Sequence, residues 1–317
     1  MTLDSILEEI KKAQTIVILT HESPDGDAVG SSLALYLALK ELNKKSVELI
    51  IPVFPKAFGF LPGVNEILKK GTMDSYDLVI ALDVADVSRL NNCIEYFENS
   101  KVKISIDHHG SNTMFADYNF VNPTSAAAGQ VLMVLFEYLQ IELTKEIAEC
   151  LYAAIVSDTG GLKYQNVTVD TFECVQILIK KGINSSEISR KMIDIMTYPR
   201  FNLTRLALDR LEFFEDGKIA FTYINLEDEK KFDAGEGDHE GIVNWGKDIE
   251  GVEVSIFLHE SIDGYKVSLR SIDKVNVADI CLLFNGGGHR QAAGCKLKMP
   301  LELSKQTILN EIIRALK

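Results

Sequence analysis

The sequence has few cysteines, and no two of them form a CxxC pair among its 317 residues. The five cysteines are Cys93, Cys150, Cys174, Cys281 and Cys295. An odd number of scattered thiols is typical of a reducing compartment and argues against a disulfide framework. It also gives little support to a zinc site made of thiolates or to a catalytic cysteine, so we expect buried, free thiols.

Long hydrophobic runs are also missing. No apolar run approaches the roughly 18–20 residues that a helix needs to cross a bilayer. The first residues, MTLDSILEEIKKAQ, are amphipathic and acidic, whereas a signal peptide has a basic region followed by an apolar one. We therefore expect a cytoplasmic protein without a membrane anchor.

Positive charge is scarce. The 33 Lys and Arg residues face 46 Asp and Glu residues, which gives a net charge of −13 and a pI of about 5.0. A chain this acidic repels long polyanions and offers no broad basic stripe, so we expect no long nucleic acid as a partner. A small phosphorylated ligand could still bind where a metal ion supplies local positive charge.

The length suggests two domains. In the first part of the chain, apolar stretches that read as strands alternate with stretches of helical spacing, which predicts a parallel sheet with helices on both faces. The predicted strands cover 15–20, 47–54, 78–86 and 102–109, and later helices are predicted at 125–140, 144–160 and 169–182.

The pattern changes after about residue 190. Alternating stretches at 218–226, 252–260 and 265–272 predict strands of a smaller, mixed-sheet α/β domain. A short helix at 276–284, a glycine-rich segment and a final helix follow. The predicted division is a first domain at 1–190, a linker at 191–205 and a second domain at 206–317.

Acids and histidines gather at the ends of four predicted elements. His21, Asp25 and Asp27 follow the first strand, Asp83 lies near the end of the strand at 78–86, Asp107, His108 and His109 end the strand at 102–109, and Asp158 lies near the end of the helix at 144–160. In an open α/β sheet, ligands bind at the carboxyl ends of the strands. Each motif alone also has a simpler explanation, because aspartates cap helices and glycines end them. The first loop, however, has two acids and a histidine where a cap needs one acid.

Leaving out Asp107 and His109, these motifs contain four carboxylates and two imidazoles. That set is too acidic for a structural zinc site and suits Mn²⁺, with Mg²⁺ or Co²⁺ as alternatives. Six ligands exceed the needs of one catalytic ion. Two ions about 3.5–4 Å apart, bridged by a carboxylate, activate water and neutralise a phosphoryl group in known enzymes.

At this point the sequence resembles a known family. The segments HESPDGDAVGS, DVAD, DHH and SDTG, in this order, resemble the four motifs of the DHH phosphoesterases, and GGGHRQAAG resembles the glycine-rich signature of the DHH-associated C-terminal domain. The resemblance covers about residues 13–300, and the combination is specific although each short motif is weak. Within the family, the chain looks most like the bifunctional nanoRNase and pAp phosphatase subgroup.

The resemblance implies a role for each residue of the four motifs. It implies that His21 and Asp25 hold one metal ion, that Asp27, His108 and Asp158 hold a second, and that Asp83 bridges both. It also implies that His109 faces the phosphate and serves as general acid for the leaving group. Asp107 would then orient the histidines or the substrate.

For the second domain, the resemblance implies a substrate-binding surface facing the metal site across a cleft between the domains. Its residues would be Arg270, Gly287, Gly288 and His289, which would hold a terminal phosphate or nucleotide of a short substrate. Arg290, in the same glycine-rich segment, is a further candidate for phosphate binding. Without the resemblance, the glycine run predicts only a flexible loop and Arg270 a surface arginine. The two remaining histidines, His239 and His259, are interpreted as a solvated residue and a surface or inter-domain contact.

The implied activity is a Mn²⁺-dependent phosphohydrolase that degrades short oligonucleotides to mononucleotides and converts pAp to AMP. A phosphodiesterase for cyclic di-AMP or pApA would use the same chemistry and scaffold. An inorganic pyrophosphatase is disfavoured, because its second domain carries a basic Ser-Arg-Lys cluster not seen here. A processive exonuclease of the RecJ type is disfavoured by the acidity of the chain. A nucleotide sensor without turnover is a further alternative, and the family implies a homodimer.

Overall fold

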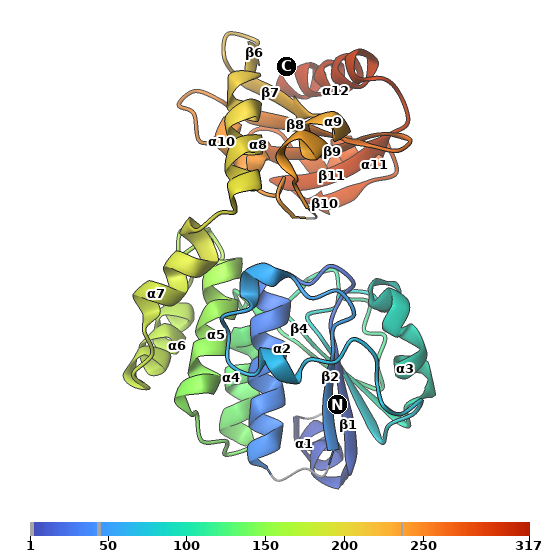
Figure 1. The fold of residues 1–317 in the computed structure, drawn as a ribbon, viewed down its shortest axis with the longest axis vertical. Helices are drawn as coiled ribbons and strands as arrows, with labels where there is room; N and C mark the ends of the chain where they lie inside the picture. Colours follow the sequence, from blue (N-terminus) through green and yellow to red (C-terminus); the bar gives the residue numbers. More distant parts are fainter. Residues whose placement is uncertain (1–2, 43–45, 236) are drawn as a thin grey trace. The chain divides into compact units, whose positions relative to one another are not determined.

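The structure is a computed structural model that describes residues 3–42, 46–235 and 237–317. The chain divides into two compact units, Met1–Ile195 and Met196–Lys317 (Figure 1). Each unit has its own sheet and its own buried hydrophobic clusters. This agrees with the predicted α/β fold of two domains.

The division between the units falls inside the range predicted as a linker, 191–205. The chain there is largely helical: η4 (Arg190–Asp194) is a π-helix, and α8 (Tyr198–Asp209) begins three residues after Ile195. Thr197 caps α8 by accepting a hydrogen bond from the N–H of Arg200 at 3.1 Å.

The first unit contains a five-stranded parallel sheet in the order β2-β1-β3-β4-β5. Its strands are β1 (Thr15–Leu19), β2 (Ser46–Ile50), β3 (Leu78–Leu82), β4 (Val102–Asp107) and β5 (Tyr118–Val121). The predicted parallel sheet is confirmed, and its carboxyl ends lie along one edge. The sequence did not predict β5, a half-buried edge strand of only four residues.

The strands end earlier than predicted. β3 stops at Leu82 because Asp83 has a φ of 60°, which takes the chain out of the extended conformation. β4 stops at Asp107, so both histidines that follow lie beyond the strand. These early ends place the polar side chains on the loops at the carboxyl edge of the sheet.

Helices cover both faces of this sheet. On β1, Ile16 and Ile18 pack with one set of helices, whereas Val17 and Leu19 point to the opposite face. The first set is α1 (Leu3–Lys12), α2 (Gly26–Glu41), α4 (Ala128–Tyr138), α5 (Lys145–Asp158), α6 (Val169–Lys180) and α7 (Ser185–Ser189). The opposite face is covered by η3 (Val87–Cys93) and α3 (Ile94–Asn99). The chain between β2 and β3 also contains two short 3-10 helices, η1 (Lys56–Phe58) and η2 (Val64–Glu66).

The second unit contains a mixed sheet of six strands in the order β10-β11-β9-β8-β7-β6. Its strands are β6 (Glu212–Phe214), β7 (Ile219–Ile224), β8 (Val254–Ser261), β9 (Gly264–Ser271), β10 (Gly287–His289) and β11 (Ala292–Leu297). Only β7 and β8 pair in parallel, and the other pairs are antiparallel. The predicted mixed sheet is therefore confirmed.

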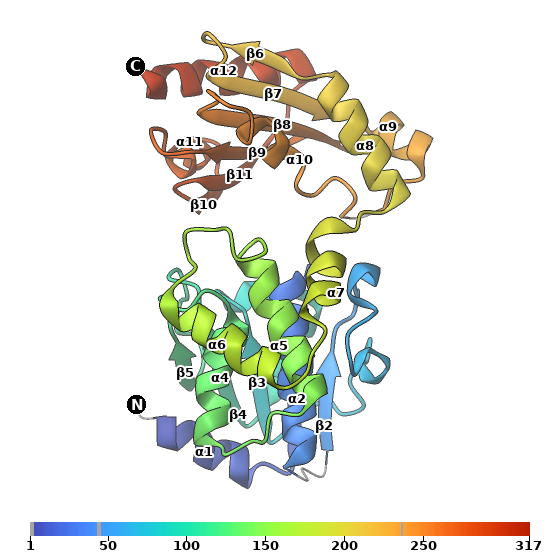
Figure 2. The same ribbon diagram turned by 90° about the vertical axis from the view of Figure 1, so that its left-hand side faces the viewer.

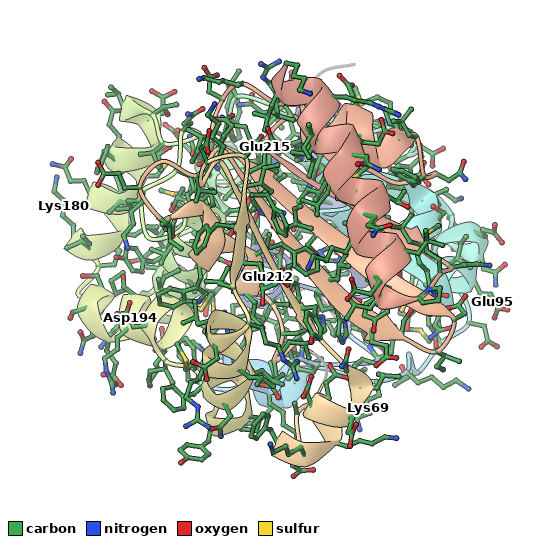
Figure 3. The ribbon with its side chains drawn as sticks, turned by 90° about the horizontal axis from the view of Figure 1, so that it is seen from above. Lys69, Glu95, Lys180, Asp194, Glu212 and Glu215 are labelled. Carbon is green, nitrogen blue, oxygen red and sulfur yellow. The ribbon has the colours of Figure 1, made fainter. Side chains whose placement is uncertain are left out.

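Helices also cover both faces of the second sheet (Figure 2). One face packs on α11 (Val277–Leu282) and α12 (Leu301–Leu316), and the other packs on α8 and α10 (Ile242–Lys247), while α9 (Leu226–Phe232) follows β7. Charged side chains such as Glu95 and Lys180 of the first unit and Glu212 of the second are exposed (Figure 3). Glu212 forms an ion pair of 2.7 Å with Lys305 of α12.

All five cysteines are free. Cys93, Cys150 and Cys281 are buried, as predicted, whereas Cys174 and Cys295 are only half-buried. In the three described ranges of the chain, none of the helices has the length and apolar character needed to cross a membrane.

Candidate active site

The first loop places three polar side chains at the carboxyl end of β1. His21 lies in the loop, Asp25 is the N-cap of α2, and Asp27 lies in the first turn of that helix. The Oδ1 atom of Asp25 accepts hydrogen bonds from the N–H groups of Asp27 and Ala28, both at 3.0 Å. Asp25 is therefore a helix cap, and it still leaves a second carboxylate oxygen for another partner.

Close packing of two helices brings Asp27 and Asp158 together. A Cβ atom on Gly30 would lie 2.6 Å from the carbonyl oxygen of Cys150 and 2.8 Å from the nitrogen of Ala154. Only glycine therefore allows α2 to approach the backbone of α5 this closely. Asp27 at the start of α2 and Asp158 at the end of α5 then lie 3.6 and 3.2 Å from the Nε2 atom of His108.

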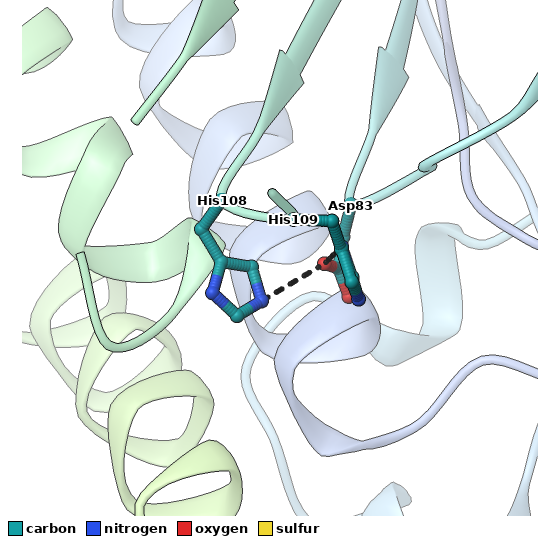
Figure 4. Close-up of side chains that lie close together, drawn as sticks. All are labelled: Asp83, His108 and His109. Atoms are coloured by element: carbon teal, nitrogen blue, oxygen red, sulfur yellow. Dashed lines mark ion pairs between the residues drawn. The ribbon is translucent and has the colours of Figure 1, made fainter. Parts of the chain in front are cut away.

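Asp83 occupies the centre of these side chains. Its left-handed backbone is held by a 2.9 Å hydrogen bond from its N–H to the carbonyl of Ile106. Its carboxylate is 2% exposed and lies 4.0 Å from Nε2 of His21 and 3.6 Å from Nε2 of His108. Figure 4 shows the imidazole of His108 facing this carboxylate. Within the described part of the chain, Oδ1 of Asp83 is buried and has no hydrogen-bond partner.

The structure thus brings all six predicted metal ligands together. One group consists of His21, Asp25 and Asp83, and a second consists of Asp27, His108 and Asp158; within each group, one ligand atom per residue lies within 4.8 Å of the others. The short contact between Asp83 and His108 joins the two groups. Their role as metal ligands remains a prediction.

The carboxylates repel one another in a poorly solvated site. Burial, followed by repulsion from Asp158 and Asp25, raises the pKa of Asp27 well above its ordinary value. Burial, followed by repulsion from Asp27, also raises the pKa of Asp83 well above its ordinary value. Burial, followed by repulsion from Asp25, raises the pKa of Asp158 to about 7. Burial lowers the pKa of His108, which disfavours its charged form.

This electrostatic environment and the donor atoms fit divalent cations. A cation would neutralise the crowded carboxylates, and it would give a partner to Oδ1 of Asp83, which is buried and accepts no hydrogen bond from the described residues. Neutral imidazoles and carboxylates are ordinary ligands of such ions. The residues present are therefore suited to hold divalent metal ions.

His109 is held differently from His108. Its Nδ1 atom lies 2.7 Å from Oδ1 of the fully buried Asp107, and its side chain is 32% exposed. The hydrogen bond to Asp107 raises the pKa of His109. Burial acts to raise the pKa of Asp107, but the hydrogen bonds from His109 and Asn112 outweigh it and hold that pKa below its ordinary value. Asp107 is thus a charged acceptor that orients His109.

Two further residues of the site carried little signal in the sequence. The amide of Asn112 donates to Oδ2 of Asp107 at 2.7 Å and to the carbonyl of Val84 at 3.0 Å. The guanidinium of Arg89 lies 3.4 Å from Nδ1 of His21. Arg89 is the only basic residue between Asp83 and Lys101, and this isolated position is the only feature of the sequence that could have indicated a role for it.

The predicted substrate-binding residues all lie in the second unit. Gly287, Gly288 and His289 form β10, so the glycine run is a strand of a hairpin and the alternative reading as a flexible loop is wrong. Gly288 has a φ of 143°, and a Cβ atom there would lie 2.4 Å from the carbonyl oxygen of Ala292. Only glycine therefore allows this close approach of β10 to β11.

Arg270 and His289 share one face of the second sheet. Arg270 on β9 pairs with Ala292 on β11, which pairs in turn with His289 on β10. Directly paired residues of antiparallel strands point to the same face, so the two side chains lie roughly 10 Å apart across two strand spacings. Arg290 follows at the turn and donates a 3.0 Å hydrogen bond to the carbonyl of Asp273.

The remaining two histidines are not solvated surface residues. His239 and His259 are both partly buried, and their rings stack with centroids 4.0 Å apart. The interpretation of His239 as solvated is therefore wrong, because the loop that carries it folds back against β8.

Comparison with known proteins gives the family. The N-terminal domain of the DHH family matches residues 15–155, and the DHHA1 domain matches residues 216–317. The bifunctional oligoribonuclease and PAP phosphatase NrnA of Thermus thermophilus is 33% identical over 313 residues, which cover 97% of this chain and 92% of that protein.

Two solved structures share the fold. An exopolyphosphatase-related protein from Bacteroides fragilis has a TM-score of 0.90 at 29% identity, covering 99% of this chain and 97% of that one. RecJ from Thermus thermophilus, solved in complex with Mn²⁺, has a TM-score of 0.56 at 15% identity over 98% of this chain and 54% of its own. This second likeness concerns the fold alone. The two matched domains and the relative aligned along almost its whole length show that the chain belongs to the DHH family and is a phosphoesterase.

Proposed function

We propose that the protein is a Mn²⁺-dependent phosphohydrolase that degrades short oligonucleotides to mononucleotides and converts pAp to AMP. The observation that carries the proposal is the position of Asp83, a buried carboxylate close to both groups of candidate ligands. The name of the relative from Thermus thermophilus, an oligoribonuclease and PAP phosphatase, supports the choice of substrates.

The proposed metal ligands divide between two ions. His21 and Asp25 would hold one ion, Asp27, His108 and Asp158 would hold the other, and Asp83 would be shared. A mixture of carboxylates and imidazoles suits Mn²⁺, with Mg²⁺ or Co²⁺ as substitutes. When bound, such a pair supplies Lewis acidity for a phosphoryl group and for an attacking water.

The proton for the leaving group would come from His109. Because Nδ1 of His109 is bonded to Asp107, its Nε2 atom is the one available to a substrate. The negative charge of Asp107 stabilises the imidazolium and fixes the orientation of the ring. We therefore assign His109 as general acid and Asp107 as the residue that positions it.

The second unit would bind a phosphate of the substrate. Arg270 and His289 lie on one face of its sheet, and Arg290 follows in the adjoining turn. A guanidinium matches the geometry of a phosphate, and the backbone of Gly287 and Gly288 allows close approach of a ligand. With a net charge of −13, the protein as a whole repels long polyanions, so short substrates are favoured.

The test is product analysis with purified protein and Mn²⁺. The substrates are pAp, pApA, a labelled three-nucleotide RNA, a long RNA, cyclic di-AMP and pyrophosphate. Asp83→Asn removes the shared carboxylate, and Asp170→Asn makes the same change at an exposed position of the first unit. We expect hydrolysis of pAp and the short RNA by the wild type and by Asp170→Asn, and its loss in Asp83→Asn.

Other outcomes would change the proposal in defined ways. Preference for cyclic di-AMP or pApA would make the protein a signalling phosphodiesterase with the same site. Rapid cleavage of the long RNA would contradict the argument from charge. Hydrolysis of pyrophosphate alone would overturn the assignment to oligonucleotides and pAp.

A further inference from the structure

A second cluster of metal-binding residue types lies in the second unit. Glu229 comes from α9, His239 from the loop between α9 and α10, and His259 from β8. One ligand atom from each residue lies within 4.8 Å of the other two. Oε1 of Glu229 is 2.8 Å from Nε2 of His259 and 3.7 Å from Nδ1 of His239.

A simple ion pair between Glu229 and His259 does not account for this arrangement. Nδ1 of His239 lies 3.7 Å from the same carboxylate oxygen, is buried, and has no hydrogen-bond partner among the residues that the structure describes. Nδ1 of His259 is also buried and lacks such a partner in the same residues. Leaving a polar atom buried and unpaired costs about 1–3 kcal/mol. A ligand bound to Nδ1 of His239 would remove this cost.

The two imidazoles stack on each other. The rings of His239 and His259 have centroids 4.0 Å apart and 26° between their planes, so one ring must turn about its Cβ–Cγ bond for both lone pairs to meet on one ion. Burial, then the neighbouring His259 and Lys266, lower the pKa of His239 to about 4. Its imidazole is therefore neutral near pH 7 and retains a lone pair for an ion.

The donor set selects the class of ion. Two imidazoles and one carboxylate form a familiar zinc set, whereas the site in the first unit has four carboxylates. Tetrahedral ligands about 2.0–2.1 Å from Zn²⁺ lie roughly 3.3 Å apart. The observed separations of 2.8 and 3.7 Å from the Glu229 oxygen lie on either side of that spacing.

We propose that Glu229, His239 and His259 bind one Zn²⁺ ion. The ion would join the loop that carries His239 to α9 and β8, three segments that are separate in the sequence. This site is distinct in position and composition from the acidic cluster of the first unit, and it does not depend on the proposed activity.

The test is the stoichiometry of Zn²⁺ binding to metal-free, full-length protein, measured by equilibrium dialysis and elemental analysis. His239→Ala and Glu229→Gln each remove one ligand. Glu227→Gln is the matched control, because Glu227 lies in the same helix and is exposed. We expect both ligand variants to bind one equivalent fewer than the wild type, and the control to bind as much as the wild type. Equal stoichiometry in all four proteins would overturn the proposal.

A second measurement uses only the wild-type protein, so it does not depend on how the variants fold. Diethylpyrocarbonate modifies accessible imidazoles, and mass spectrometry reports each histidine separately. We expect Zn²⁺ to lower the modification of His239 several-fold and to leave that of the exposed His289 unchanged. Modification of His239 at the same rate with and without Zn²⁺ would show that no ion binds there.

Discussion

Nδ1 of His109 donates a 2.7 Å hydrogen bond to Asp107, which is fully buried and accepts a second side-chain bond from Asn112. The side chain of the neighbouring His108 makes no such bond to Asp107, and its Nε2 atom lies 3.2 Å from Asp158 and 3.6 Å from both Asp27 and Asp83. Two adjacent histidines on one loop are therefore prepared for different tasks. His108 presents a nitrogen to the acidic cluster, and His109 is held as a proton donor.

The first prediction follows from this difference. His109→Ala should lower kcat for pAp by about 10²–10⁴-fold, the usual contribution of a general acid, with little change in KM. Asp107→Asn should lower kcat less, because His109 remains but loses its charged partner. Steady-state kinetics in Mn²⁺ would measure both, and an unchanged kcat in His109→Ala would contradict its assignment as general acid.

Metal binding should stabilise the protein. The buried carboxylates of Asp27 and Asp83 repel each other without a cation, so Mn²⁺ should raise the thermal midpoint by several degrees when present well above its dissociation constant. Chelation with EDTA should reverse the shift and abolish turnover. Asp83→Asn should show a much smaller shift, whereas Asp170→Asn should respond like the wild type in a differential scanning fluorimetry series.

The sequence could predict which polar residues lie close together because of the topology of a parallel sheet. Strands separated by crossover helices must end at one edge, so polar residues after β1, β3 and β4 meet whatever the details of packing. His21, Asp83 and His108 could therefore be placed together before their contacts were known. Asp158 ends a helix and not a strand, so this topological argument does not place it, although the sequence included it among the acidic motifs.

Other features could not be predicted because their signal lies in tertiary contacts. Asn112 sits in an ordinary turn, and only the structure shows that its amide reaches Asp107. The strand β10 is three residues long and mostly glycine, so it has no apolar alternation. His239 and His259 are 20 residues apart on different elements, and no local pattern predicts that their rings stack.

Phosphate binding by the second unit leads to a prediction about KM. Arg270→Ala should raise KM for pAp by about 10–100-fold, which corresponds to roughly 1.5–3 kcal/mol for a hydrogen bond to a charged group. Arg314→Ala is the matched control, because Arg314 lies on the exposed surface of α12 and pairs with Glu311. A loss confined to kcat in Arg270→Ala would place that residue in the chemical step instead.

Helix packing at Gly30 predicts that replacing this glycine with alanine lowers the stability of the protein. In an exposed helix, replacing glycine with alanine stabilises the protein by up to about 1 kcal/mol. In Gly30→Ala, the new methyl group would press on the backbone of α5, so we expect a loss of about 1–3 kcal/mol. Mn²⁺ affinity should also fall, because Asp27 would move relative to Asp158. Denaturant unfolding and metal titration would measure the two effects, and a gain in stability would show that the helices can separate without cost.

The last prediction concerns pH and a carboxylate far from the acidic cluster. Asp77, just before β3, accepts hydrogen bonds from the N–H groups of Gln14 and Thr15, both at 3.1 Å, and from Lys101 at 2.8 Å. The bond from Lys101, followed by that from Thr15, lowers the pKa of Asp77 to about 2. Its stabilising effect is therefore complete above the unfolded-state value near 4 and is lost as the pH falls toward 2.

Asp77→Asn should thus be less stable than the wild type by about 1–2 kcal/mol at pH 7, since the uncharged amide has only one acceptor oxygen and loses the bond from Lys101 or those from the N–H groups of Gln14 and Thr15. The difference should shrink steadily as the pH is lowered from about 4 to 3, because the wild-type carboxylate begins to take up protons in the unfolded chain first. Urea unfolding followed by circular dichroism at several pH values measures this difference in the free energy of unfolding. Asp74→Asn, an exposed residue of the same loop, is the control and should differ little from the wild type at any pH. A difference for Asp77→Asn that stays constant from pH 7 to 3 would show that the carboxylate titrates alike in the folded and unfolded chains.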